Sequence, residues 1–148
     1  MDVITENTVV PKLRFGEFKE DWKIEPIGNF INLLSGYAFK GDDISDDNKG
    51  IPLLRGINIT EGHIRHNVKI DRYFTGDTSK MEKLLLKVDD LVLGMDGSKV
   101  GKNVALITEK DKDSLLIQRV ARLRVNHQSD IRYIYQQLFS NKFHKYVY

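Results

Sequence analysis

Two short apolar runs separated by a glycine-rich loop constrain this chain more than any other feature of its sequence. The stretch LVLGMDGSKVGKNVALI, residues 91–107, contains three glycines and two lysines. Glycine adopts positive φ without a steric penalty, and tight connections between strands often require such a φ. The stretch therefore predicts strands over 89–95 and 102–108, joined by a hairpin-like loop.

A nucleotide-binding P-loop is the alternative for this stretch, and its pattern is G-x-x-x-x-G-K-[ST]. Gly97 and Gly101 lie one residue too close together, and Asn103 stands where the pattern needs a hydroxyl. A P-loop also opens a helix, whose N-terminus favours phosphate, whereas an apolar, strand-like run follows Lys102. The dinucleotide fingerprint G-x-G-x-x-G is absent as well, so the sequence argues against a nucleotide-dependent enzyme.

The elements before the glycine loop follow from hydrophobic periodicity and turn residues. Asn29 and Gly36 are placed to begin and end a short helix over 29–36, and a loop rich in Gly and Asp covers 36–50. Strands are expected over 51–59 and 63–70, paired as a hairpin, with a short helix around 78–84.

After the glycine loop we expect one strand over 115–125 and then a helix. Ser129 or Asp130 is placed to cap this helix, whose apolar residues from Ile131 to Val147 keep helical spacing. The whole pattern predicts an α+β fold with a curved, mixed or antiparallel sheet, a short N-terminal helix and a C-terminal helix. Residues 1–10 are expected to form a flexible lead-in, and residues 11–148 a single domain.

Composition limits the classes of protein that remain. The 148 residues suit one domain with its own core, and no apolar run approaches the roughly 20 residues that span a bilayer. The absence of cysteine excludes disulfides and thiolate metal sites. The first residues lack the pattern of a secretory signal, so we expect a cytoplasmic protein without a membrane partner.

A search for catalytic and metal-binding patterns finds none that is complete. The sequence lacks a cysteine nucleophile, a G-x-S-x-G motif and the (N/D)PP(Y/F/W) stretch of a DNA methyltransferase. His63 and His66 would lie on opposite faces of a strand, and the Asp-rich segment 42–47 lacks the spacing of an EF-hand loop. We therefore predict no enzyme activity, no metal and no cofactor.

Residue types that contact phosphates or base edges gather in a few segments. The net charge of +2 is too small to indicate a polyanion partner, but basic residues are concentrated in 97–102 and 118–124. Gln118, Arg122 and Arg124 share one face of the predicted strand, whereas Arg119 points the other way. These residues either contact a nucleic acid or simply solvate an exposed face of the sheet.

Several segments of the sequence together resemble a known family. PKLRFGEFKEDWKIEPIGNFINLLSGYAFK (11–40) is similar to the opening of a target recognition domain from the specificity subunit of type I restriction–modification enzymes. Segments 50–59, 87–106 and 115–125 fit the same pattern in the same order, and 131–147 resembles the helix that ends the domain. The resemblance covers nearly the whole chain from residue 11.

The resemblance implies a sequence-specific DNA-binding role without catalysis. In that family each recognition domain reads one half of a bipartite site, and long helices dock methyltransferase (modification) subunits, which motor/nuclease (restriction) subunits join. The chain is less than half as long as a full specificity subunit, so it corresponds to one recognition domain without the spacer helix. We expect isolated DNA affinity to be weak and salt-sensitive.

Residue types and resemblance together give a predicted set of DNA-binding residues: Tyr37, Lys40, Arg55, Asn58, Ser98, Lys99, Lys102 and Arg119. The alternative hypothesis is a protein–protein interaction module, or a decoy, that binds restriction–modification subunits without reading DNA. Exposure of the apolar side chains of the last helix, Tyr135, Phe139, Phe143 and Tyr146, would support this alternative.

Overall fold

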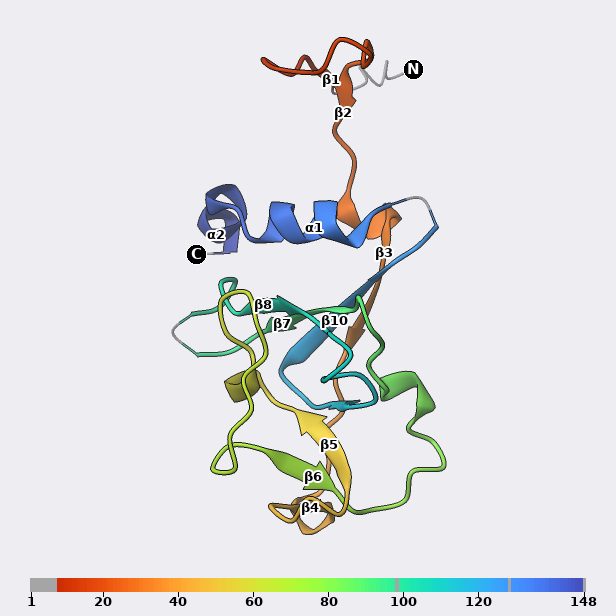
Figure 1. Cartoon of the computed structure of the whole chain (residues 1–148), viewed down its shortest axis with the longest axis vertical. Helices are drawn as coiled ribbons and strands as arrows, with labels where there is room; N and C mark the ends of the chain where they lie inside the picture. The colour runs from red at the N-terminus through yellow and green to blue at the C-terminus, as the bar shows by residue number, and fades with distance from the viewer. Residues whose placement is uncertain (1–7, 98, 128, 148) are drawn as a thin grey trace, which may run out of the picture.

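The structure, a computed structural model, describes residues 8–97, 99–127 and 129–147 (Figure 1). One antiparallel sheet has the strand order β3 (Ile31–Ser35), β10 (Val120–Val125), β7 (Leu91–Gly94) and β8 (Val104–Leu106). A second, mixed sheet has the order β4 (Ile44–Ser45), β6 (Arg72–Phe74), β5 (Ile51–Leu54) and β9 (Leu115–Leu116). The predicted α+β class and the strand pair around the glycine loop are confirmed.

Helical segments and a small strand pair complete the chain. The 3-10 helices are η1 (Ile27–Asn29), η2 (Gly41–Asp43), η3 (Gly56–Asn58) and η4 (Glu82–Leu84). Near the C-terminus lie α1 (Ile131–Leu138) and α2 (Asn141–Val147). Strand β1 (Thr8–Val9), inside the segment predicted as a lead-in, pairs with β2 (Trp22–Lys23), and this part extends away from both sheets (Figure 1).

The core has one layer on each side of the first sheet. Helix α1 crosses one face (Figure 1), and its Ile131, Ile134 and Leu138 pack against Leu91 and Leu123. The other face joins the second sheet through a cluster of buried side chains: Leu54, Ile59, Leu86, Val92, Ala105, Ile107, Leu116 and Val120. Because this cluster takes residues from both sheets, it fixes them against each other.

Two chain segments cross side by side from one sheet to the other. Beyond β3, Gly36 N–H donates to the carbonyl of Val120 and Tyr37 N–H donates to that of Leu116, at 3.0 and 3.1 Å. The carbonyl of Tyr37 accepts from Gln118 N–H at 2.8 Å. A Cβ on Gly36 would lie 1.9 Å from the carbonyl oxygen of Ile117, so this approach is open only to glycine.

The predicted helix over 29–36 is wrong, because residues 31–35 form strand β3. All five of its residues pair with β10. A short helix is marginal on its own, and pairing with a buried strand outweighs its local preference. Gly36 therefore permits close packing of two backbones and does not end a helix.

The predicted hairpin over 51–70 is also wrong. Strand β5 pairs with β6 and β9, and residues 63–70 contribute only an isolated bridge between Ile64 and Ile59. The side chain of Asn58 takes over part of the backbone hydrogen bonding here, since it accepts from Arg55 N–H and donates to the carbonyl of Arg65. A side chain that satisfies backbone groups in this way replaces a strand ladder.

The predicted strand over 115–125 is divided between the two sheets. It forms β9 and β10, with Gln118 and Arg119 in a turn between them. The predicted helix around 78–84 is reduced to η4.

The C-terminal helix begins as predicted but is broken. The carboxylate of Asp130 caps α1 by accepting from Arg132 N–H at 2.8 Å. A second helix starts after Ser140, whose hydroxyl accepts from Phe143 N–H. Of the four apolar side chains whose exposure was in question, Tyr135 and Phe143 pack against the core, whereas Phe139 and Tyr146 are exposed.

We predict that Gly36→Ala lowers the free energy of unfolding by about 1–3 kcal/mol, the usual range for an overpacked site. The added methyl group collides with backbone atoms of Ile117, which have no rotamer to change. Chemical denaturation measures the effect. Gly28→Ala is the matched control because nothing lies within 4 Å of its Cβ position; equal stability of both variants would contradict the close approach.

Candidate nucleic-acid interface

An open hollow of about 580 Å³ lies where the two sheets meet. Its lining comes from β4, β6, the end of β5, the end of β7 and the β9–β10 turn: Ile44, Arg55, Gly56, Ile57, Arg72, Asp96, Ile117, Gln118 and Arg119. The lining thus includes three arginines, one glutamine and a single acidic residue, Asp96. We call this feature the arginine hollow.

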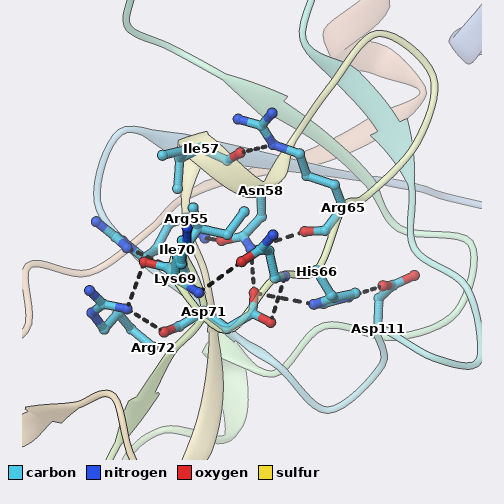
Figure 2. A network of polar contacts seen from close by, with 11 residues as sticks. Arg55, Ile57, Asn58, Arg65, His66, Lys69, Ile70, Asp71, Arg72 and Asp111 are labelled. Carbon is cyan, nitrogen blue, oxygen red and sulfur yellow. Dashed lines mark hydrogen bonds and ion pairs between the residues drawn. The ribbon is translucent and has the colours of Figure 1, made fainter.

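Backbone carbonyls hold two of the arginines in place, as Figure 2 shows. Arg55 Nη1 donates to the carbonyl of Ile70 at 2.8 Å, and Arg72 Nη1 donates to the carbonyl of Asp71 at 2.7 Å. Each contact uses a neutral acceptor and leaves further N–H groups of the guanidinium free of it. The positive charge of both side chains is therefore ordered without being neutralised by these bonds.

Asn58 lies at the centre of the network in Figure 2. Its side chain is 1% exposed and donates to Asp71 Oδ1 at 2.9 Å, in addition to its bonds with Arg55 and Arg65. The prediction that Asn58 contacts DNA is not supported, because a buried carboxamide with these partners has no face for a ligand. Asn58 instead positions the segments that carry Arg55 and Arg72.

The β9–β10 turn places Gln118 and Arg119 side by side at the rim. Arg119 has a φ of 63°, in the left-handed region that residues with a side chain seldom adopt. Its Nη1 lies 3.3 Å from Asp96 Oδ2, and the two side chains are 72% and 48% exposed. The ion pair is consequently solvent-exposed and contributes little to stability.

A second hollow of about 550 Å³ lies beside the glycine loop and is lined by Ile59, Thr60, Glu61, His63, Arg65, Lys99 and Asn103. Lys99 Nζ lies 2.9 Å from Glu61 Oε1, and this hydrogen bond, together with the lysine charge, lowers the pKa of Glu61. Both hollows border the same two segments, 55–61 and 95–103. The same two chain segments thus contribute residues to both hollows.

The predicted site residues divide into those on this surface and those away from it. Arg55 and Arg119 line the arginine hollow, and Lys99 lines the second hollow, with the half-buried Lys102 in the same loop. Tyr37 is 54% exposed and Lys40 is exposed, but neither lines a hollow described here. Ser98 lies outside the described residues.

Sequence reasoning missed Arg72 and grouped two other arginines wrongly. Arg72 lines the hollow because β6 pairs with β5, and no local sequence pattern predicts this pairing. Arg122 is 5% exposed and bonds Asn32, whereas the half-buried Arg124 forms two hydrogen bonds with buried Asp90 at 2.6 and 2.7 Å. They stabilise the sheet and do not solvate an open face.

His66 joins the loop before β6 to the polar turn before β9. Its Nδ1 lies 3.5 Å from Asp71 and its Nε2 lies 2.8 Å from Asp111. Burial raises the pKa of Asp111, but hydrogen bonds from Thr108 and His66 outweigh burial and leave it below the ordinary value. Among the described residues, no group of three or more His, Asp or Glu side chains could hold a metal ion.

The fold and the surface define a class: a small α+β domain that displays ordered arginines and carboxamides around an open hollow at a sheet junction. No helix in the described part of the chain is long and apolar enough to cross a membrane. The comparisons with known proteins narrow this class to a family.

Two curated relatives are specificity subunits of type I restriction enzymes. The EcoAI subunit of Escherichia coli is 33% identical over 111 residues, which cover 73% of this chain and 18% of the relative. The MjaVIII subunit of Methanocaldococcus jannaschii is 25% identical over 146 residues, or 96% of this chain and 33% of the relative. The chain thus spans a third or less of the length of these relatives, and no family model matches it.

Solved structures show the same fold. The HsdS subunit of Thermoanaerobacter tengcongensis superposes with a TM-score of 0.60 at 13% identity, over 89% of this chain and 30% of that subunit. A chain from work on complex assembly and conformational transition of the type I R-M system gives 0.54 at 10% identity, over 78% of this chain and 28% of its own length. By sequence and fold, the chain corresponds to part of a type I restriction enzyme specificity subunit.

We predict that Asn58→Leu lowers the free energy of unfolding by about 1–3 kcal/mol, because buried backbone groups lose their partners. The same variant loosens Arg55 and Arg72, whose segments Asn58 connects. Urea denaturation and the hydrogen-exchange rates of amides in 55–72 measure the two effects. Asn48→Leu, at an exposed position, is the control. Hydrogen-exchange rates in 55–72 of Asn58→Leu that equal those of the wild type would contradict the positioning role.

We predict that Asp111→Asn removes acid-sensitive stability. The pKa of Asp111 is lowered on folding, so its contribution is present above the unfolded value near pH 3.8 and is lost as the pH falls through the folded value. At neutral pH the variant should be less stable by about 1–3 kcal/mol, and its stability should fall less steeply between about pH 5 and 2. Denaturation at several pH values measures this, with the exposed Asp46→Asn as control; parallel pH profiles would refute it.

Proposed function

We propose that this chain is a DNA-binding domain that reads one half of a bipartite site within a type I restriction–modification specificity subunit. The observation that carries the proposal is the arginine hollow, whose lining includes Arg55, Arg72 and Arg119 and a single carboxylate, that of Asp96. Guanidinium groups bind phosphates and guanine edges, and carboxamides such as that of Gln118 bind adenine edges. The kinship with specificity subunits supports the same function.

The shape of the surface favours a large ligand over a small molecule. The arginine hollow is open to solvent, and the second hollow, to which the same two chain segments contribute, is lined by Arg65, Lys99 and Asn103. A duplex presents one phosphate charge per roughly 1.7 Å of its axis, so it matches a surface on which cationic side chains are spread over two hollows. A compact ligand would need a closed pocket with converging polar groups.

The proposal includes a division of labour with other proteins. This domain supplies sequence recognition without catalysis, while modification subunits methylate and restriction subunits cleave the DNA to which it directs them. The relatives are specificity subunits several times longer than the matched region, and their remaining length would provide the contacts to those subunits. A cytoplasmic location follows from this role.

We predict that the chain binds duplex DNA with an affinity that falls steeply with salt, because phosphate contacts release counterions. Lys99→Ala should weaken binding to every duplex and reduce the slope of log K against log [salt] by about 1. Fluorescence anisotropy with a labelled duplex, titrated at salt concentrations from about 50 to 200 mM, measures both the affinity and the slope. Over this range a protein with several phosphate contacts loses about 10³–10⁵ in affinity. An unchanged slope would remove Lys99 from the interface.

Lys112→Ala provides a matched control for that measurement. Lys112 also forms a lysine–glutamate ion pair, with Glu109 at 2.8 Å, but it lines neither of the two hollows. Its loss should leave the affinity and the salt slope close to wild type. Absence of duplex binding by the wild-type chain at low salt would overturn the proposed function itself.

A further inference from the structure

We infer that Arg119 is a specificity-determining residue that reads a guanine, with Asp96 as the positioning residue that holds it until the base arrives. The inference rests on the proposed function and adds which side chain discriminates between bases. It is carried by the β9–β10 turn at the rim of the arginine hollow, by its backbone conformation and by the Asp96 contact.

The turn is held rigidly from three directions. The carbonyl of Tyr37 accepts from Gln118 N–H at 2.8 Å, and Gly36 N–H donates to the carbonyl of Val120 at 3.0 Å. On the β7 side, Met95 N–H donates to the carbonyl of Arg119 at 2.9 Å. A backbone anchored on each side of the turn presents its side chains at a fixed place, which direct readout of a base edge requires.

The conformation of Arg119 indicates a demand on its side chain. Its φ of 63° would suit glycine or asparagine, and an arginine there costs free energy that folding does not require. Such strain concentrates at sites where function selects the residue. The side chain is largely exposed and its one polar contact within the described part of the chain is the ion pair with Asp96, so packing does not explain the choice of arginine.

The contact between Arg119 and Asp96 is one that a base can readily replace. Only Nη1 of Arg119 makes the contact, at 3.3 Å, whereas a bidentate pair with O6 and N7 of guanine uses two N–H groups. Asp96 lies against Gly56 on the other side, with its Oδ1 3.2 Å from the Cβ position of that glycine. A duplex with guanine at the matching position draws the guanidinium away, and any other base leaves it on the carboxylate.

This arrangement gives base discrimination a clear source. When guanine is absent, the phosphate backbone approaches a carboxylate whose charge is only partly offset by Arg119, which disfavours binding. When guanine is present, two directed hydrogen bonds replace one wet ion pair. Asp96 thus suppresses binding to wrong sequences, while Arg55 and Arg72, which backbone carbonyls hold, serve the phosphates.

The test begins with selection of the preferred duplex from a randomised library by the wild-type chain, followed by substitution of each base pair in turn. At one guanine the wild type should lose roughly 5- to 150-fold in affinity, the range for a bidentate contact. Arg119→Gly should lose discrimination at that position alone, while its stability equals or exceeds that of wild type because glycine accepts the turn conformation. Asp96→Asn should raise affinity for all duplexes and narrow the gap between right and wrong base.

Asp113→Gly is the matched control, since Asp113 has a φ of 64° but lines neither hollow. It relieves the same backbone strain and should keep the wild-type base preference. Unchanged preference in Arg119→Gly, or a loss of affinity that is equal for all sequences, would overturn the inference while leaving the proposed function standing. If the wild-type chain enriches no motif, the proposed function fails first.

Discussion

The close approach of two backbones at Gly36 is the constraint on which the rest of this structure depends. Because Gly36 has no side chain, the segment after β3 lies directly against Ile117 and hydrogen-bonds the residues on both sides of it. This contact carries the chain from one sheet to the other and defines the turn that holds Gln118 and Arg119. The arginine hollow exists because the two sheets meet at this place.

The arginines of the chain serve opposite purposes according to which face of the sheets they occupy. Arg124 forms a bidentate pair with the buried Asp90, which occupies its Nε and Nη2 groups. Its pKa is raised by this hydrogen bonding, whereas burial lowers the pKa of Arg122. Five residues earlier than Arg124, the exposed Arg119 has only a wet partner. Arginines that are close in sequence thus have different roles: Arg124 stabilises the sheet, whereas Arg119 lies on the surface.

The surface charges are supported by neutral groups as much as by opposite charges. Backbone carbonyls hold Arg55 and Arg72, and a buried carboxamide connects the segments that carry them. An arginine ordered by a neutral acceptor keeps its positive field and has already lost much of its side-chain freedom, which lowers the cost of binding. Substitution of the rim residues Gln118 and Arg119 is compatible with such a surface, because neither residue belongs to a core cluster.

The sequence alone determined the α+β class, the strand pair around the glycine loop, the start of the C-terminal helix at Ser129 or Asp130 and the kinship with specificity subunits, because each depends on local patterns or on motifs in a fixed order. It misassigned residues 29–36 and 63–70, where pairing with a distant strand or bonding to the Asn58 side chain outweighs local preference. Only the tertiary structure decided which arginines are buried, brought Arg72 into the same hollow as Arg119, and withdrew Asn58 from the surface. The physical reason is that exposure and charge pairing are set by contacts between residues far apart in the chain, which no local pattern encodes.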